Sequence, residues 1–510
     1  MPTVKGIFLV PYMIINWLQN KVEHRVTLNK GKMEMTLNMV WLLPEILLLT
    51  MACLILVIDA YLPKQLQNLT YQLAQGTLIG LALLIIAGFP QEQVLAMNNM
   101  FVLDPMGAVL KLFIVLIVFV AFIYSRGYLQ DRNFLKGEYF VLGLFAALGM
   151  MVMVSAYSLL MVYLGLELLS LSLYAMVAMH RDSQKASEAA MKYFVLGAIA
   201  SGMLLYGMSI LYGVTGTLDL VTLAQAISTD TEHHTLLVFG LVFVIVGLAF
   251  KLGAVPFHVW IPDVYEGAPT AVTLFISSAP KIAAFAMLMR LLVDGMPHLH
   301  ADWQDILIVL SILSMATGNI IAIAQHNIKR MLAYSTIAHV GYLLLGVIAA
   351  RETGYAASMF YVLVYSLMTL GAFGMIVLLS RAGFEAERIE DFKGLNERSP
   401  WYAFLMLILM LSMAGVPPMV GFWAKWLVLE QIINAGFIWL AIVAVIFALI
   451  GAFYYLRIVK LMYFDKPEEM APIEAGMDMR VALSANALVI LFLGMMPHSL
   501  MAICLDALVK

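Results

Sequence analysis

Long apolar runs follow one another along almost the whole chain and are separated by short polar loops. A helix needs about 20 mostly apolar residues to cross a bilayer, and in lipid a helix satisfies its own backbone hydrogen bonds whereas an open sheet does not. Of the 510 residues, 63% are hydrophobic and 12% are charged, against about 25% charged residues in soluble domains. The sequence therefore predicts an all-α polytopic membrane protein with one transmembrane domain.

We count about fourteen runs whose length suits a membrane-crossing helix. They lie near residues 39–62, 71–89, 105–125, 138–156, 157–179, 187–212, 235–255, 271–290, 303–324, 328–350, 357–380, 401–433, 437–463 and 481–504.

The composition also argues against several classes of function. A net charge of −3 without a basic tract gives no indication of nucleic-acid binding. Cys53 and Cys504 stand alone in apolar runs, so the sequence predicts neither an iron–sulfur nor a zinc site. The glycine-rich phosphate-binding motifs of nucleotide sites are also missing. We therefore expect no cofactor and no metal in this chain.

Basic residues gather in the loops that follow odd-numbered runs. These loops hold Lys64, Arg126, Arg132, Lys136, Arg181, Lys185, Lys329, Arg330, Arg381, Arg388, Lys393, Arg398, Lys466 and Arg480. The loop at 213–234, which follows an even-numbered run, contains acidic residues but no lysine or arginine. By the positive-inside rule, the basic loops face the cytoplasm, and both ends of the helical unit lie on the periplasmic side.

Residues 1–34 do not fit this alternation, because they are basic on what would be the outer side. Their apolar piece at 7–18 is only about 18 Å long as a helix, too short to cross the membrane. We assign the transmembrane domain to residues 35–510. Residues 1–34 are treated as an N-terminal extension, either from a start codon placed too early or from a segment at the membrane surface.

Two runs carry glycine and proline in their middle, and we expect both helices to be broken there. The seventh run has Gly253 and Pro256, and the twelfth has Gly415, Pro417 and Pro418. Proline removes a helical hydrogen bond and clashes with the preceding turn. The breaks are five runs apart, so the second is inverted relative to the first. This predicts two inverted five-helix repeats, at about 138–290 and 303–463, and paired broken helices point to an ion pathway.

Four ionisable residues stand near the middle of apolar runs: Glu167, Lys251, Lys281 and Lys425. A charge at the centre of a bilayer costs about 2.5–3.5 kcal/mol even on mild insertion scales. Such residues need a wet or paired environment, so we interpret them as parts of a proton pathway. The alternative is a fixed ion pair or a lysine that reaches the membrane surface.

Other polar residues are weaker candidates. Lys192 lies about one turn inside its run, so it is either a member of the pathway or a lysine whose side chain reaches the membrane surface. His258 and His339 are either proton relays or hydrogen-bonded packing residues. Asp263 and Glu266 are more consistent with orienting the broken helix. Further buried-charge candidates are Glu45, Lys111 and Arg457.

Glu167 and Lys251 suggest a switch that needs no cofactor. A carboxylate beside a desolvated lysine stabilises its charged form, and separation of the two favours release of the proton. Their contact is a hypothesis at this stage.

Several stretches resemble the antiporter-like membrane subunits of respiratory complex I (NADH:quinone oxidoreductase). They are Gly-Leu-Ala-Phe-Lys-Leu-Gly-Ala-Val-Pro-Phe-His-Val-Trp at 247–260, Gly-Leu-Glu-Leu-Leu-Ser at 165–170, Asn-Ile-Lys-Arg-Met-Leu-Ala-Tyr-Ser at 327–335 and Phe-Tyr-Tyr-Leu-Arg at 453–457. The resemblance covers essentially everything after Met35 and is closest to the N-type subunits. The chain lacks the long lateral helix of the L-type, and it has Lys425 where the M-type has glutamate.

The resemblance implies a proton-translocating subunit of a bacterial inner-membrane respiratory complex. Glu167, Lys251, Lys281 and Lys425 then take the family's proton-pathway roles, assisted by Lys192, His258 and His339. NADH, FMN, iron–sulfur clusters and the quinone (ubiquinone or a relative) belong to partner subunits of the electron-transport chain. Pro280, which departs from the family pattern, is expected to bend the eighth run.

Two rival functions share parts of this pattern. A subunit of a multisubunit cation/proton antiporter has the same broken helices and lysines but is driven by an ion gradient. A non-translocating membrane scaffold does not need four ionisable residues inside its helices. Purification with flavin and iron–sulfur subunits favours complex I, and purification with membrane subunits alone favours the antiporter.

Overall fold

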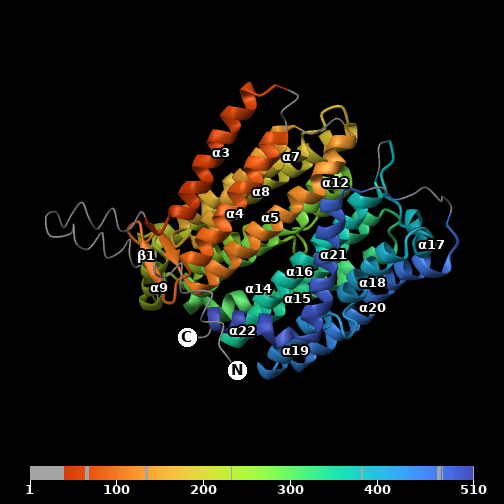
Figure 1. Ribbon diagram of the computed structural model, residues 1–510. Helices are drawn as coiled ribbons and strands as arrows, with labels where there is room; N and C mark the ends of the chain where they lie inside the picture. Colours follow the sequence, from red (N-terminus) through yellow and green to blue (C-terminus); the bar gives the residue numbers. More distant parts are fainter. Residues whose placement is uncertain are drawn as a thin grey trace, which may run out of the picture.

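The computed structural model describes residues 40–63, 68–132, 136–230, 232–380, 383–467, 473 and 475–508. The expectation for residues 1–34 lies outside this part of the chain. Within it, 13 helices are long and apolar enough to cross a membrane, and most of the long helices run roughly parallel or antiparallel to one another (Figure 1). The predicted all-α polytopic fold is confirmed.

Most of the spans are single helices. These are α3 (Leu43–Tyr61), α4 (Asn68–Ala87), α5 (Pro105–Asp131), α6 (Gly137–Ser155), α7 (Leu159–Val177), α8 (Gln184–Thr215), α14 (His300–Ile323), α15 (Ile328–Ile348), α16 (Glu352–Leu379), α20 (Ile438–Phe464) and α21 (Met477–Met495), whereas α10 (His234–Leu252) begins a broken span. The spans that are broken are described separately below.

The seventh span is broken where the sequence predicts it. Helix α10 ends at Leu252, and a short α11 (Trp260–Gly267) continues the path. Gly253 has φ +86°, and its amide and that of Ala254 donate back to the last turn of α10, to Phe250 and Ala249. This is the glycine-based ending in which a left-handed residue closes a helix.

The twelfth span is broken in the same way. Helix α18 (Pro400–Ala414) ends at Gly415, whose φ is +85°, and α19 (Val420–Asn434) follows. The amides of Gly415 and Val416 donate to Ser412 and Leu411 in the pattern found after α10. Each half has 15 residues, too few to span alone, so α18 and α19 together form the twelfth predicted span and bring the 13 spans to fourteen.

The eighth span also bends. Helix α12 (Thr270–Ser277) stops at Ser278, and α13 (Ala279–Leu288) leads into the π-helical turn η4 (Met289–Asp294). Pro280 lies in the first turn of α13, where a missing amide hydrogen removes no helical bond. The expected bend is therefore present, but it lies at Ser278, one residue before α13 begins.

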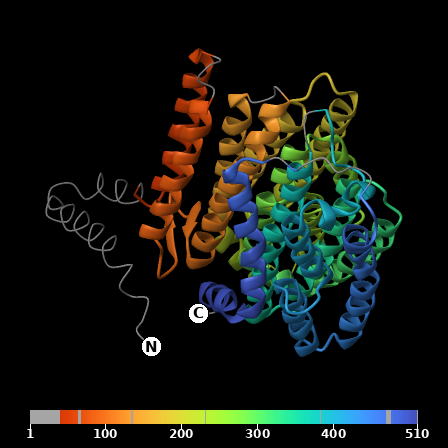
Figure 2. The ribbon, with the colours of Figure 1, turned by 45° about the vertical axis from the view of Figure 1, so that its right-hand side comes forward.

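Smaller elements were not predicted by the apolar pattern. A hairpin joins β1 (Val94–Ala96) to β2 (Phe101–Leu103), and α9 (Leu220–Thr229) lies within the acidic loop. The remaining pieces are the 3₁₀ turns η5 (Pro297–Leu299) and η6 (Ile389–Phe392) and the short α17 (Leu395–Arg398). The last run is shorter than predicted, because α22 (Pro497–Leu508) turns away from α21 and lies across one end of the bundle (Figure 2).

Three spans form the centre of the bundle. The most apolar stretch of the eighth span (α12 to η4) is 100% buried and those of α15 and α16 are 94% buried, against 22% in α3 at the edge, which stands apart in Figure 2. Close packing of helices uses small residues: a Cβ on Gly149 would lie 2.5 Å from the backbone of Leu169, so α6 and α7 meet at this glycine. Polar side chains on the central helices are therefore shielded from lipid by the helices around them.

Candidate functional site

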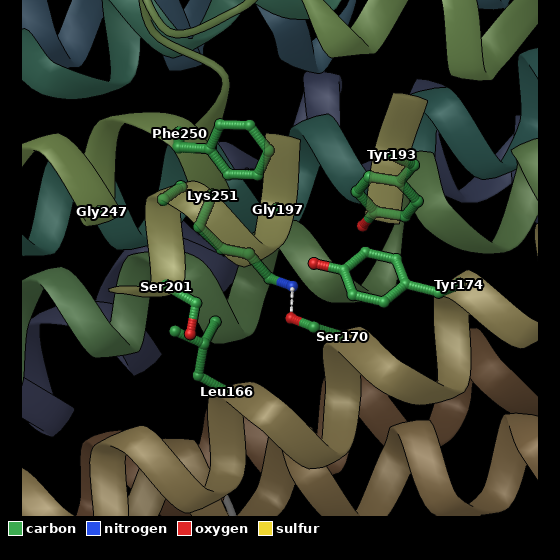
Figure 3. A pocket seen from close by; sticks show the side chains of 10 residues that line it. Leu166, Ser170, Tyr174, Tyr193, Gly197, Ser201, Gly247, Phe250 and Lys251 are labelled. Carbon is green, nitrogen blue, oxygen red and sulfur yellow. Dashed lines mark hydrogen bonds between the residues drawn. The ribbon is translucent and has the colours of Figure 1, made fainter. Parts of the chain in front are cut away.

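Lys251 lies in the last turn of α10 and is buried. Its Nζ donates to Ser170 Oγ of α7 at 2.9 Å, as Figure 3 shows. The amine points into a pocket between α7, α8 and α10, lined also by Tyr174, Tyr193 and Gly197. The cavity volume of this pocket is about 20 Å³, enough for about one water molecule.

Glu167 lies one turn before Ser170 in α7 but turns toward α8. It accepts a short hydrogen bond from Ser201 Oγ, while Lys251 bonds to Ser170. In this part of the chain the carboxylate and the lysine form no direct ion pair within 4.0 Å. Glu167 of α7 and Lys251 of α10 instead bond to different hydroxyl groups, those of Ser201 and Ser170, so the switch hypothesis stays a prediction.

Lys281 lies in the first turn of α13, next to the bend at Ser278, and is 4% exposed. Its Nζ donates to the carbonyl oxygen of Leu252 at 2.8 Å, and it lies 5.7 Å from the centre of the Trp260 ring. Leu252 is the last residue of α10 and the neighbour of Lys251. The break of α10 therefore brings the two lysines to the same helix end.

Lys425 has an equivalent place in the second half of the chain. It lies on α19, and its Nζ donates to the carbonyl oxygens of Met413 and Ala414 at 3.2 and 2.9 Å. Those carbonyls end α18. The Lys425 amine also lies 5.2 Å from the centre of the Tyr342 ring.

Both breaks thus present unpaired carbonyl oxygens to an ammonium group. The last four carbonyls of a helix lack partners inside it, and the helix dipole favours a cation there. This explains how Lys281 and Lys425 are accommodated inside the bundle. Sequence reasoning identified the lysines but missed their acceptors, although Gly253 and Gly415 as helix-ending residues were the available signal.

His339 lies on α15 and is 3% exposed. Its Nδ1 is 2.6 Å from Tyr361 Oη, and its Nε2 is 3.1 Å from Tyr455 Oη. Tyr455 in turn forms a short hydrogen bond with Ser335. The histidine is therefore a member of a hydroxyl network and also packs among tyrosines.

Helix α16 carries polar contacts from this network to the bend of the eighth span. Tyr365 Oη donates to Thr336 Oγ1 at 2.7 Å. The next residue, Ser366, and Thr369 one turn further donate to the carbonyl oxygens of Ser278 and Ser277, each at 3.3 Å. Polar groups thus connect the surroundings of Lys281 with those of His339.

Lys192 lies apart from the buried polar residues around Lys251, Lys281, His339 and Lys425. Its side chain is 43% exposed and pairs with Asp263 at 2.7 Å and Glu188 at 2.8 Å. Arg330 of α15 also pairs with Asp263, at 2.8 Å, and with Glu266, at 3.0 Å. These pairs fasten α11 between α8 and α15.

The remaining candidates are dispersed. His258 is part-buried, and within the described chain its Nδ1 has no hydrogen-bond partner. Glu45 and Lys111 form a buried ion pair at 2.6 Å between α3 and α5, away from the breaks. Arg457 approaches Glu390 at 3.7 Å with both side chains part-exposed. Among the described residues, no three His, Cys, Asp or Glu side chains are placed to hold a metal ion.

Known proteins share this sequence and architecture. Residues 156–451 match the family model described as NADH:quinone oxidoreductase/Mrp antiporter, TM. NADH-quinone oxidoreductase subunit N of Thiobacillus denitrificans is 60% identical over 466 residues, which are 91% of this chain and 96% of that protein. The chain belongs to the subunit N family. Its members are antiporter-like membrane proteins, as the broken helices and buried lysines of this chain indicate.

Solved structures agree with this assignment. A chain of respiratory complex I from Thermus thermophilus with bound aureothin is 31% identical, with a TM-score of 0.78, over 90% of this chain and 98% of that one. A chain of the Mrp complex from Dietzia is 22% identical, with a TM-score of 0.81, over 93% and 96%. The second likeness supports the fold alone, because its identity is lower.

Proposed function

We propose that the chain is a membrane subunit of NADH:quinone oxidoreductase that translocates protons, driven by quinone reduction in other subunits. The observation that carries this proposal is the pair of broken helices whose exposed carbonyls each hold a buried lysine, Lys281 and Lys425. Buried ionisable groups inside a membrane mark ion or proton pathways. Identity of 60% to a protein named subunit N supports the assignment to this complex.

The chain supplies proton carriers and no redox group of its own. NADH, FMN, iron–sulfur clusters and quinone are assigned to partner subunits, and the contacts of this chain are with other membrane subunits and lipid. The chain therefore responds to redox chemistry through electrostatic or conformational changes passed from its neighbours.

Glu167 and Lys251 form the adjustable part of the pathway. Lys251 reaches Ser170, and Glu167 lies one turn earlier on the same helix. A small rotation of the lysine toward Glu167 would hold its charge, and its return to Ser170 would favour release toward Lys281. Lys192 and His258 assist at the margin, and His339 serves the second repeat.

The repeats at about 138–290 and 303–463 provide two inverted half-pathways. The basic loops are assigned to the cytoplasm and both ends of the unit to the periplasm, by the positive-inside rule. The site of action is the bacterial cytoplasmic membrane.

The second candidate function is a subunit of a cation/proton antiporter, favoured by the family description and by the fold of the Mrp complex. Purification from native membranes separates the two. Flavin and iron–sulfur proteins in the complex support the first function, and a complex of membrane proteins alone supports the second.

Quinone-linked proton pumping in membranes that carry Lys251→Ala tests the role of the pathway. We expect electron transfer to continue with fewer protons pumped per electron, since the variant removes a proton carrier. Asp305→Asn, at an exposed position of α14, is the control and is expected to pump normally. Full pumping in Lys251→Ala would contradict the proposal.

A further inference from the structure

Three glutamates in the loop between α16 and α18 each reach a cation on a different helix. Glu385 pairs with Arg132 of α5 at 2.6 Å, Glu387 with Lys329 of α15 at 2.8 Å, and Glu390 with Arg457 of α20 at 3.7 Å. The side chains of the two arginines are 18% and 27% exposed, whereas that of Lys329 is 2% exposed. Only the pair of Glu387, among these three, joins a part-exposed carboxylate to a fully buried ammonium group.

Lys329 lies at the second residue of α15 and faces inward. Besides Glu387, it donates to the carbonyl oxygen of Ala268 at 3.2 Å, where α11 ends. Isolated buried charges are costly, and lysine rarely stays buried without a reason. The part-exposed Glu387 and the buried Lys329 therefore connect solvent with the interior beneath α11. They do so at the basic face, the end of the bundle that carries the basic loops.

The face of α15 that follows Lys329 is polar. Thr336 lies two turns further in, about 10 Å along the helix, and accepts from Tyr365 Oη at 2.7 Å. The ring of Tyr365 lies 4.8 Å from that of His339, centre to centre. Two hydroxyl groups, those of Thr336 and Tyr365, thus lie between Lys329 and the histidine, which itself bonds to Tyr361 and Tyr455.

A buried hydroxyl lies beside this line. Tyr265 on α11 is fully buried, and among the described residues its Oη makes no well-formed hydrogen bond. The Thr336 hydroxyl is nevertheless close enough to act as a donor to it, and Tyr365 influences it electrostatically. A buried hydroxyl in this state calls for an explanation, and a role in proton transfer is one.

We propose that Glu387 and Lys329 form a proton entrance on the basic face, which supplies His339 by way of Tyr265, Thr336 and Tyr365. This inference rests on the proposed proton-translocating function and names an uptake route for it. Glu387 takes a proton from solvent, and Lys329 relays it inward.

The proton steps balance with water as the only further proton carrier. Lys329 gives one proton to a water beneath α11 and is reprotonated by Glu387, which returns to the carboxylate. The bond between Thr336 and Tyr365 must first reverse, because Tyr365 is its donor; each hydroxyl of the line then accepts a proton on a lone pair and passes on its own, so no hydroxyl changes its net charge. His339 is the acceptor at the end of the line.

Replacement of the three glutamates one at a time tests the entrance in the complete complex in native membranes. Glu387→Gln is expected to lower the protons pumped per NADH oxidised, and Glu387→Asp is expected to retain them because the acid is kept. Glu390→Gln weakens the loop's contact with Arg457, and Glu385→Gln weakens contacts with Arg132, Tyr128 and Thr270. Among the described residues, neither of these glutamates pairs with Lys329, so both variants are expected to pump normally. Equal pumping in all three glutamine variants would overturn the proposal, and so would an equal loss in all three.

Tyr265→Phe removes one hydroxyl that makes no well-formed hydrogen bond among the described residues, so the substitution changes the packing of the folded structure little. We expect the complex to assemble normally and to pump fewer protons, and normal pumping would overturn the proposed route. Lys251→Ala distinguishes the two levels of inference. If it loses pumping while Tyr265→Phe and Glu387→Gln do not, only the entrance is wrong; if all three pump normally, the proposed function is wrong.

Discussion

Lys281 combines two properties that different substitutions separate. Its ammonium group satisfies the carbonyl oxygen of Leu252 at 2.8 Å, and it is the part of the residue that holds a proton. The first property stabilises the break of α10, and the second belongs to the proposed pathway. A side chain that donates a hydrogen bond but does not titrate keeps the contact with Leu252 and loses the ability to carry a proton.

We therefore compare Lys281→Gln with Lys281→Met. Both are expected to lower proton pumping, because neither can carry a proton. Met leaves the Leu252 carbonyl without a partner and is expected to cost about 1–3 kcal/mol of unfolding free energy, whereas Gln is able to donate and costs less. Thermal unfolding of the detergent-solubilised complex measures the difference. Equal stability of the two variants would contradict the capping role.

Asp104 is a second residue with a measurable electrostatic role. It lies just before α5 and pairs with the buried Arg290 at 2.8 Å, which also pairs with Asp294 at 3.0 Å. Burial by itself raises the pKa of Asp104, but the Arg290 guanidinium and the Gly107 amide outweigh it, so the pKa lies below its usual 3.8. The carboxylate therefore stabilises the fold above that value, and the stabilisation is lost as the pH falls through the lowered pKa.

Asp104→Asn is expected to cost about 3 kcal/mol near neutral pH, because it leaves a buried charge with one partner fewer. The difference from the unchanged protein should shrink as the pH falls below 3.8. Unfolding measured across that range tests the sign, and the exposed Asp305→Asn is the control, with an expected change below about 0.5 kcal/mol. A difference that does not depend on pH would exclude an electrostatic cause.

The broken helices α10 and α18 show what local sequence can and cannot predict. Glycine followed by proline inside an apolar run predicted both breaks, because backbone chemistry is local. The acceptors of the lysines were not predictable in the same way. Lys281 bonds to a residue 29 positions earlier, and such contacts depend on how the spans pack rather than on the runs themselves.

Gly415 connects a break to its lysine. A Cβ there would lie 2.9 Å from Lys425 Cδ and 3.3 Å from its Nζ, and the φ of +85° disfavours any side chain. Gly415→Ala is expected to cost about 1–2 kcal/mol and to lower proton pumping by displacing the lysine. Gly216→Ala, with φ +71° and open space around it, has the backbone cost alone. Normal pumping in Gly415→Ala would show that the lysine tolerates the displacement.

Across the whole molecule, the apolar pattern predicted the number and order of the spans almost completely. The predicted total of fourteen is reached only when the 15-residue halves α18 and α19 are counted together as one span, because each is too short to span alone. The pattern missed β1–β2 and α22, since short elements at the membrane surface carry no long apolar run. In Figure 1 these elements lie at the end of the bundle that also holds α9, and α17 lies at the other end.

This arrangement makes the orientation of the whole chain testable with single cysteines. Ser228 in α9 and Glu397 in α17 are exposed, and the charge bias of the loops assigns them to the periplasm and the cytoplasm. In a Cys53→Ala background, a maleimide that does not cross membranes is expected to label Ser228→Cys in intact cells. Glu397→Cys is expected to react only in inverted vesicles. The reverse labelling pattern would place Glu387 on the periplasmic side, opposite to the proposed uptake side. The contacts of Lys251, Lys281 and Lys425 inside the bundle would stay as described.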